Sequence, residues 1–198
     1  MLQAQRGITL VELLISTALL VGGVGALLLG MNVTMAHSDY LRDFQIAMNA
    51  AEGRLEELAA TTAADFNTLS IGAEFAQARS ATGQCRGMGE DQNCNGRLDV
   101  AVPAEDVNQN GQLDEPLAGG RLTIQIRTFP VGTPFANANL LDLHVAACWN
   151  TRSRQIGEDQ NCNGLIDAGE DGATPLNPVA DGWVDSPVMV TTRIARRQ

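Results

Sequence analysis

A long apolar run opens the chain. Residues 13–31 are nearly all apolar or small, and no charged side chain stands between Glu12 and Asp39. At about 1.5 Å per helical residue, such a run spans the ~30 Å hydrocarbon core of a bilayer. A secretory signal is the alternative, but its apolar core is usually only ~7–15 residues long and ends in a small-x-small cleavage site, which this run lacks. The pattern predicts a membrane-spanning helix over 8–31.

A second helical pattern follows, with apolar residues on one face only. Its apolar positions recur every three or four residues, as on one stripe of a helix: Leu41, Phe44, Met48, Ala51, Leu55 and Leu58. A coiled coil is the alternative, but only about three heptads are present, fewer than a convincing coiled coil sustains. The pattern therefore predicts an amphipathic helix over 32–60 that packs on the protein's own sheet.

The remainder of the chain, 61–198, is predicted to form a β-rich head. Residues 61–88 are rich in Thr, Ala, Ser and Gly and indicate a connecting loop, and strand-like runs follow at 121–129, 140–149 and 183–194. The first run alternates apolar and polar residues, as a half-buried strand does. Strands separated by turns favour a small antiparallel sheet laid on the helix. The predicted fold class is α+β.

Glu12 is the unusual residue of the apolar segment, because a carboxylate at the edge of a membrane span is costly without a partner. Thr9 and Glu12 match the S/T-x-x-E capping box, which satisfies the amides at a helix start. A second interpretation is that the chain is cut after Gly7. The new α-amino group of Ile8, on the same or a neighbouring subunit, would then pair with Glu12.

Residues 6–14, RGITLVELL, resemble the cleavage and methylation segment of type IV prepilins and type II secretion pseudopilins. The resemblance implies a leader over 1–7, cleavage between Gly7 and Ile8 by a prepilin peptidase, N-methylation of Ile8, and a role for Glu12 in setting subunit register. Two departures are Ile8, where the family usually has Phe, and a leader with a single Arg.

The resemblance also implies a location and partners. The chain would lie in the inner membrane with its head in the periplasm, and would then join other subunits in a surface pilus or a periplasmic pseudopilus. A tip adhesin is a further candidate partner. The segment AMNAAEGRLEELAA and the closing VTTRIAR look most like the minor subunits of PilV or GspI type. The alternative of another class is a membrane-tethered, calcium-dependent adhesion module.

One acidic phrase occurs three times in the chain. Residues 89–96 and 157–164 both read GEDQNCNG, and residues 105–115 read EDVNQNGQLDE. Each copy alternates Asp and Asn with other residues, then has Gly, a hydrophobic residue and a further Asp. Ca²⁺ takes six to eight oxygen ligands, and a loop of this kind can wrap the ion. The copies resemble EF-hand loops of the dockerin type without flanking helices, and predict calcium loops at 91–102, 106–117 and 159–170.

The predicted ligands are Asp91, Asn93, Asn95, Arg97 and Asp99 in the first loop, Asp106, Asn108, Asn110, Gln112 and Asp114 in the second, and Asp159, Asn161, Asn163, Leu165, Asp167 and Glu170 in the third. Only the third loop has an acid at its twelfth position, where a bidentate ligand is expected. In the others, Glu105 or Glu115 could substitute, or the two loops could share ligands. The third loop is the best candidate and the second the weakest. Two or three structural Ca²⁺ ions are expected, with affinities near the ~10⁻⁴–10⁻³ M of extracellular modules.

A plainer interpretation makes each Asn-Gly pair of the copies a tight hairpin turn. It leaves the charge distribution unexplained. Residues 89–115 and 157–171 hold twelve of the 23 acids and one of the 13 basic residues, so the net charge of -10 belongs to these loops. The rest of the chain is nearly neutral, and no basic face of the kind that nucleic-acid binding proteins show is expected.

The cysteines stand at 85, 94, 148 and 162, and two of them lie inside the copies. Pairing Cys85 with Cys94 and Cys148 with Cys162 is the economical connectivity among the three that four cysteines permit. Zinc is the alternative, but no C-x-x-C spacing supports it. Enzymatic motifs are lacking, and the histidines, His37 and His144, form no triad or metal motif. His144 is predicted to be a packed strand residue, and the chain is not expected to be an enzyme.

Overall fold

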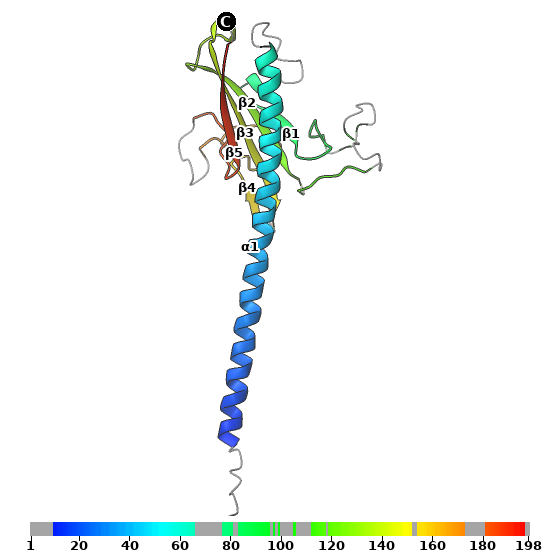
Figure 1. The fold of residues 1–198 in the computed structure, drawn as a ribbon, viewed down its shortest axis with the longest axis vertical. Coiled ribbons are helices and arrows are strands. Elements are labelled where there is room, and N and C mark those ends of the chain that lie inside the picture. The colour runs from blue at the N-terminus through cyan, green and yellow to red at the C-terminus, as the bar shows by residue number, and fades with distance from the viewer. Residues whose placement is uncertain are drawn as a thin grey trace, which may run out of the picture. The chain divides into compact units, whose positions relative to one another are not determined.

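The computed structural model describes residues 10–65, 77–80, 83–95, 97, 99, 105, 112–117, 119–151, 154–172 and 181–196. Its elements, shown in Figure 1, are α1 (Leu10–Asp65), η2 (Gln77–Arg79), β1 (Gln84–Gly87), β2 (Arg121–Phe129), η3 (Phe135–Asn137), β3 (Leu140–Thr151), β4 (Arg154–Ile156) and β5 (Met189–Ala195). The chain divides into two compact units, Met1–Arg42 and Asp43–Gln198. Each unit is described by itself.

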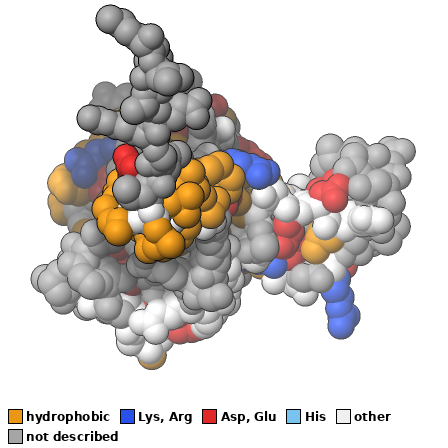
Figure 2. Space-filling model, turned by 90° about the horizontal axis from the view of Figure 1, so that it is seen from below, with side chains coloured by type: hydrophobic (Ala, Val, Ile, Leu, Met, Phe, Trp, Pro, Cys, Tyr) orange, Lys and Arg blue, Asp and Glu red, His pale blue; other side chains and the backbone are white. Residues whose placement is uncertain are grey.

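The first unit contains the apolar part of α1. This part is long and apolar enough to cross a membrane, and none of its most apolar window is buried. Leu19, for example, is 72% exposed. Figure 2 shows the hydrophobic side chains gathered around the helix. An apolar surface that surrounds a helix on all sides indicates a lipid or protein environment rather than water.

The hydroxyl groups within this apolar segment bond to the helix itself. Ser16 Oγ donates to the carbonyl of Glu12 at 2.8 Å, and Thr34 Oγ1 donates to the carbonyl of Gly30 at 2.9 Å. Thr17 Oγ1 donates to the carbonyls of Leu13 and Leu14, both at 3.0 Å. Polar groups inside a bilayer must find partners within the protein, so these hydroxyls are compatible with a membrane-spanning helix.

The second unit is built on an antiparallel sheet with the strand order β1-β2-β3-β5, and β4 pairs with the far end of β3. The register sets apolar residues opposite each other: Ile124 faces Val145, and Val145 faces Val190. The buried side chains on this face of β2 and β3 are Leu122, Ile124, Ile126, Leu141, Leu143 and Val145. The strands predicted at 121–129 and 140–149 are confirmed, although β3 continues to Thr151.

The helix that packs on this sheet is the second half of α1, so the predicted α+β fold is confirmed. Ala47, Ala51 and Leu58 are fully buried. The predicted stripe was therefore right for Ala51 and Leu58 but wrong for Leu41, which is 51% exposed. The buried line also includes Ala47, which the predicted stripe left out, because the small side chains of Ala47 and Ala51 allow a close approach between helix and sheet.

The strand predicted at 183–194 is only partly right, because β5 begins at Met189. Residues 181–186 instead cross the second face of the sheet. The buried side chain of Gln125 donates to the Gly182 carbonyl at 2.9 Å and accepts from the Val184 N–H at 3.0 Å. His144 Nε2 donates to the Val184 carbonyl at 2.8 Å. Side chains of β2 and β3 thus satisfy this backbone in place of a neighbouring strand, which a linear pattern does not reveal.

The predicted connecting loop at 61–88 also needs correction. Residues 61–65 continue α1, Gln77–Arg79 form η2, and Gln84–Gly87 form β1, which pairs with the start of β2. Four residues are too short a run to show a clear alternation of apolar and polar positions, so β1 carried no strand signal of its own. Its role is to hold the start of the first predicted calcium loop against the sheet.

Candidate functional site

The third copy of the acidic phrase folds into a loop whose polar side chains converge. Asn161 Nδ2 and Asn163 Nδ2 both donate to Asp167 Oδ2 at 2.8 Å. The backbone N–H of Asn163 donates to Asp159 Oδ1 at 3.2 Å, and the N–H of Gly164 donates to Asp159 Oδ2 at 2.7 Å. The predicted ligands Asp159, Asn161, Asn163 and Asp167 therefore share one centre.

Glu170 closes this loop. Its Oε1 accepts from the Gln160 N–H and its Oε2 from the Asp167 N–H, both at 2.9 Å. Asp159 and Glu170 are both buried. Burial raises the pKa of Asp159, and the negative charge of Glu170 raises it further, while hydrogen bonds from Gly164 and Asn163 lower it. A bound cation would favour the charged form of Asp159 that burial and the neighbouring Glu170 disfavour.

The first copy repeats this arrangement residue by residue. Asn93 Nδ2 and Asn95 Nδ2 donate to Asp99 Oδ2 at 2.7 and 2.8 Å. The Asn95 N–H donates to Asp91 Oδ1 at 3.0 Å. Glu105 Oε2 accepts from the Asp99 N–H at 2.7 Å, as Glu170 Oε2 does from Asp167. Of the two proposed substitutes for the missing twelfth-position acid, Glu105 lies in the equivalent place.

Glu115, the other proposed substitute, binds an arginine instead. Arg121 Nη1 contacts Glu115 Oε1 at 2.6 Å, and Arg121 Nη2 contacts Asp91 Oδ2 at 3.0 Å. Asp91 is fully buried and the Arg121 side chain is nearly so. In the first loop, the guanidinium group of Arg121 therefore occupies one carboxylate oxygen of Asp91, the first predicted calcium ligand.

The first half of the second predicted loop, residues 106–111, lies outside the described residues, and so do its ligands Asp106, Asn108 and Asn110. Asp114 is described, and its backbone pairs with Glu90: the Asp114 N–H donates to Glu90 Oε2 at 3.1 Å, and the Glu90 N–H donates to the Asp114 carbonyl at 3.2 Å. Gln112 and Asp114 are exposed.

The seventh position of a calcium loop contributes its backbone carbonyl. In the first and third loops this position is Arg97 and Leu165. The Arg97 N–H donates to Asn95 Oδ1 and the Leu165 N–H donates to Asn163 Oδ1, both at 2.7 Å. These bonds turn the chain in the same way in both copies.

Each of these two loops carries a disulfide. The structure joins Cys85 to Cys94 and Cys148 to Cys162, with Cα–Cα distances of 6.2 and 5.5 Å, so the predicted connectivity is confirmed. Cys94 and Cys162 have φ values of 59° and 49°, in the left-handed region that residues other than glycine seldom adopt. Both cysteines stand at the fourth position of their loop, where the bridge ties this unusual backbone to β1 in the first loop and to β3 in the third.

The two loops lie against each other, which no local pattern predicted. Gly164 of the third loop has a φ of 76°, and a Cβ at this position would collide with Cys85 of the first disulfide. A hollow of about 480 Å³ has lining residues from both loops, among them Asn93, Glu105 and Asn163. Gly164 is therefore required by both its backbone conformation and this close approach.

The hairpin interpretation of the Asn-Gly pairs is wrong for the third copy, and Gly96 of the first copy lies outside the described residues. Within the described residues, β4 before the third loop and β5 after it both pair with β3 and not with each other. Likewise, β1 pairs with β2 across a connection far longer than a tight turn. The repeated phrases build long loops held by side-chain hydrogen bonds.

Whether these loops fit a cation depends on their amides. Among the described residues, no group of three or more His, Cys, Asp or Glu side chains is arranged to hold a metal ion. The predicted ligand sets, however, are partly Asn. The amide oxygens of Asn161 and Asn163 accept from the N–H groups of Asn163 and Leu165, and the amide nitrogens face Asp167. Each side chain would have to rotate and give up its backbone hydrogen bond to direct an oxygen to the centre beside Asp167. The donor set then suits an oxygen-preferring cation such as Ca²⁺.

Two functional side chains were missed at the sequence level. Glu158 is almost fully buried, and it accepts from the Gly172 N–H at 2.8 Å and the Asp185 N–H at 2.9 Å. Glu90, its counterpart in the first copy, is also buried and accepts from Asp114. Both stand immediately before the first Asp of their copy. The repetition of this Glu in both copies was the available signal.

The predicted processing site, Gly7 and Ile8, lies outside the described residues, as does Thr9 of the capping box. Glu12 is in the first turn of α1 and is exposed. His144 is buried in β3, as predicted.

Comparison of the chain with protein-family models, with curated proteins and with solved structures gave no match.

Proposed function

We propose that this protein is a minor type IV pilin, a structural subunit that enters a filament through its N-terminal helix. The observation that carries the proposal is α1 itself. Its first half is apolar and exposed over a length that can cross a membrane, and the same helix continues into a head where Ala47, Ala51 and Leu58 are buried. A helix of this kind serves first as an anchor and then as the core of a filament.

The N-terminal segment supplies the specific part of the proposal. Residues 6–14 carry the prepilin-like Gly7, Ile8 and Glu12, so a prepilin peptidase would release an amine on Ile8. An intramembrane carboxylate with a cationic partner is stabilised relative to an isolated one. Glu12 would therefore pair with the N-terminus of a neighbouring subunit and set its register in the filament.

The head would be stabilised by disulfides and by calcium outside the cytoplasm. In the third loop, Asp159, Asp167 and Glu170 would supply charged oxygens, and Asn161 and Asn163 would supply amide oxygens. The ion's contribution would be structural, since it would neutralise the buried carboxylates and hold the loop. The first loop would use Glu105 in the place of Glu170.

Mass spectrometry of sheared surface filaments and of the remaining cell envelope tests the proposal. A form that begins at methylated Ile8, present in the sheared fraction and scarce beside a major subunit, is the expected result. The same processed form found only in the envelope would favour a pseudopilin of a type II secretion system. An uncut chain that begins at Met1 would contradict both and favour a tethered calcium-dependent module.

A further inference from the structure

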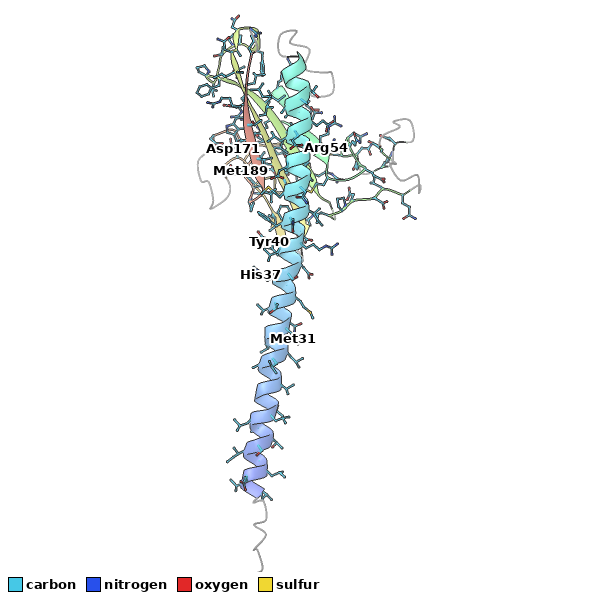
Figure 3. The ribbon with its side chains drawn as sticks, viewed as in Figure 1. Met31, His37, Tyr40, Arg54, Asp171 and Met189 are labelled. Carbon is cyan, nitrogen blue, oxygen red and sulfur yellow. A yellow bond between two sulfur atoms is a disulfide. The ribbon has the colours of Figure 1, made fainter. Side chains whose placement is uncertain are left out.

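The second face of the sheet contains a hollow of about 480 Å³, lined by both charged and apolar side chains, that the proposed function leaves unused. β3 lines it with Asp142 and His144, β5 with Met189 and Thr191, and the crossing segment 181–186 with Trp183 and Asp185. Figure 3 labels Met189 on this strand. All these residues belong to the second unit, so the hollow is a feature of the head alone.

The wall formed by residues 181–186 is a built structure. Asp171 accepts from the Asp181 N–H at 3.1 Å and from the Gly182 N–H at 2.7 Å. The ring of Trp183 lies 4.0 Å from the guanidinium carbon of Arg127 and 4.9 Å from the ring of His144. Trp183 is thus held between two side chains of the sheet, and the hollow does not depend on a loop without contacts.

The hollow has an excess of negative charge. Its single arginine, Arg193, is bound to Asp142 through two contacts of 2.6 and 3.1 Å, so these two charges offset each other. The guanidinium group of Arg127 lies over the ring of Trp183 and is attracted to Asp181, so the charge of Asp181 is also offset in part. Asp185 remains, and its carboxylate acts on His144 as a negative charge. Among the described residues, no side chain or backbone group donates a hydrogen bond to the Asp185 carboxylate. This wall is therefore complementary to a cation.

The strand beside the hollow has an open edge. Within the described residues, β5 pairs with β3 and with no other strand. Met189, Thr191 and Arg193 point to the exposed side, and the residues between them are half-buried. An unpaired strand edge is a template for a further strand, which would lie about 4.8 Å away. Side chains of such a strand would alternate between the two faces of the sheet.

We propose that the head binds an extended segment of another protein chain as an added strand along β5, with a Lys or Arg side chain of that segment in the hollow against Asp185. Backbone hydrogen bonds to β5 hold the segment, and the charge of the hollow selects a basic side chain. The long stem of Lys or Arg reaches across β5 beside Met189, while its charged end meets the carboxylate. This interaction holds for a filament subunit and for a tethered head alike.

The test uses the full chain in detergent micelles and the fluorescence of Trp183, since Trp149 is fully buried and distant from solvent. The probe is an end-capped heptapeptide that alternates Thr and Lys, and its control alternates Thr and Glu. We expect saturable binding of the Lys peptide and none of the Glu peptide. Equal binding of the two peptides overturns the proposal.

Two further measurements separate the proposed site from general attraction to an acidic protein. Asp185→Asn keeps the backbone bonds of residue 185 and is expected to weaken binding about fivefold or more, whereas Glu52→Gln, at an exposed helix position, leaves it unchanged. N-methylation of alternate residues, made in both registers, blocks strand addition and is expected to weaken binding about tenfold in one register. An unchanged affinity of Asp185→Asn for the Lys peptide refutes the proposed site. An unchanged affinity of the wild type for both methylated peptides refutes strand addition as the binding mode.

Discussion

Asp91 and Asp159 have the same sequence neighbours, but their second carboxylate oxygens meet different groups. Asp91 Oδ2 contacts the guanidinium of Arg121 at 3.0 Å, and Asp159 Oδ2 accepts from the Gly164 N–H at 2.7 Å. The Oδ1 atom of each accepts from the backbone N–H of the Asn four positions later. At the residue scale, a repeated phrase therefore specifies the turn of the loop, while the charge around its first ligand is set by residues from other parts of the chain.

Calcium should stabilise the head through the third loop. With Ca²⁺ at ten times its dissociation constant, mass action adds about 1.4 kcal/mol to the free energy of unfolding and raises Tm by several degrees. Asp167→Asn removes one charged ligand and is expected to lose most of this gain, as measured by thermal denaturation of the full chain with calcium and with chelator. An identical Tm of the wild type in calcium and in excess chelator would contradict the structural role.

Asp99→Asn provides the matched control in the first loop. Asp99 accepts hydrogen bonds from two Asn side chains of its own loop, as Asp167 does in the third loop. Arg121 already places a positive charge at the first ligand of that loop. We therefore expect Asp99→Asn to reduce the calcium-dependent rise in Tm less than Asp167→Asn does. The reverse order would make the first loop the principal calcium site.

His144 should make stability depend on pH. Burial lowers its pKa below the usual 6.5, an effect larger than the opposing hydrogen bond to Val184 and the charges of Asp185 and Asp181. The neutral ring is thus favoured in the folded state. Its contribution is fully present above pH 6.5, begins to be lost as the pH falls below 6.5, and is lost completely below the folded pKa.

Urea denaturation of the wild type and of His144→Gln between pH 5 and pH 8 checks this dependence. The Gln amide keeps a donor for the Val184 carbonyl but does not titrate. The difference in free energy of unfolding between the two proteins should shift in favour of the variant as the pH falls. If the difference does not change with pH, His144 has the same pKa in the folded and unfolded states, which would contradict the prediction.

At the element scale, α1 combines two kinds of helix. Its hydroxyl groups are bonded internally in the apolar half, and its buried line of Ala47, Ala51 and Leu58 lies in the half that belongs to the head. Helix period and apolarity are local properties, so the sequence predicted both halves. The burial of Ala47 beside Ala51 depended on which side of the helix faces the sheet in the head.

Leu58→Ala and Leu41→Ala form a matched pair that tests this correction. Leu58 is fully buried, so its truncation should lower the free energy of unfolding by about 2–5 kcal/mol. Leu41 is half-exposed, and its truncation should change the free energy of unfolding by less than about 0.5 kcal/mol in the isolated chain. Chemical denaturation measures both values. Equal losses would restore the stripe predicted from periodicity.

The path of segment 181–186, unlike the two halves of α1, could not be predicted from its local sequence. Its apolar residues resemble a strand, but buried Gln125 and His144 bind its backbone across the face of the sheet. The hydrogen bonds that decide this path join residues 40 to 59 positions apart. No pattern within the segment could have predicted them.

At the scale of the whole molecule, the proposed function uses two parts: an apolar helix that joins subunits and a head that contains two disulfides. If Glu12 sets subunit register, Glu12→Ala should reduce the amount of this protein in sheared filaments by about tenfold, which corresponds to the loss of one ion pair worth about 1.4 kcal/mol. Quantitative mass spectrometry of the filament fraction measures the effect. Cleavage after Gly7 should be unaffected, which separates assembly from processing.

Glu52→Gln serves as the control, because residue 52 is an exposed acid on the same helix within the head. Its incorporation should equal that of the wild type. Normal incorporation of Glu12→Ala would leave Glu12 with the capping role alone.

The sequence by itself determined the features that depend on near neighbours: the apolar run of α1, the strands at 121–129 and 140–149, and the pairing of each cysteine with the nearest one along the chain. These follow from periodicity and from short loop closure, which are physical properties of a local stretch.

Only the tertiary structure decided how distant parts meet. It placed Glu105 where the third loop has Glu170, brought Arg121 to Asp91, and set Gly164 against Cys85. It also turned residues 181–186 across the sheet to form a charged hollow beside β5. These contacts depend on sheet register and on which face is covered, and both arise from the packing of the whole head rather than from any single segment.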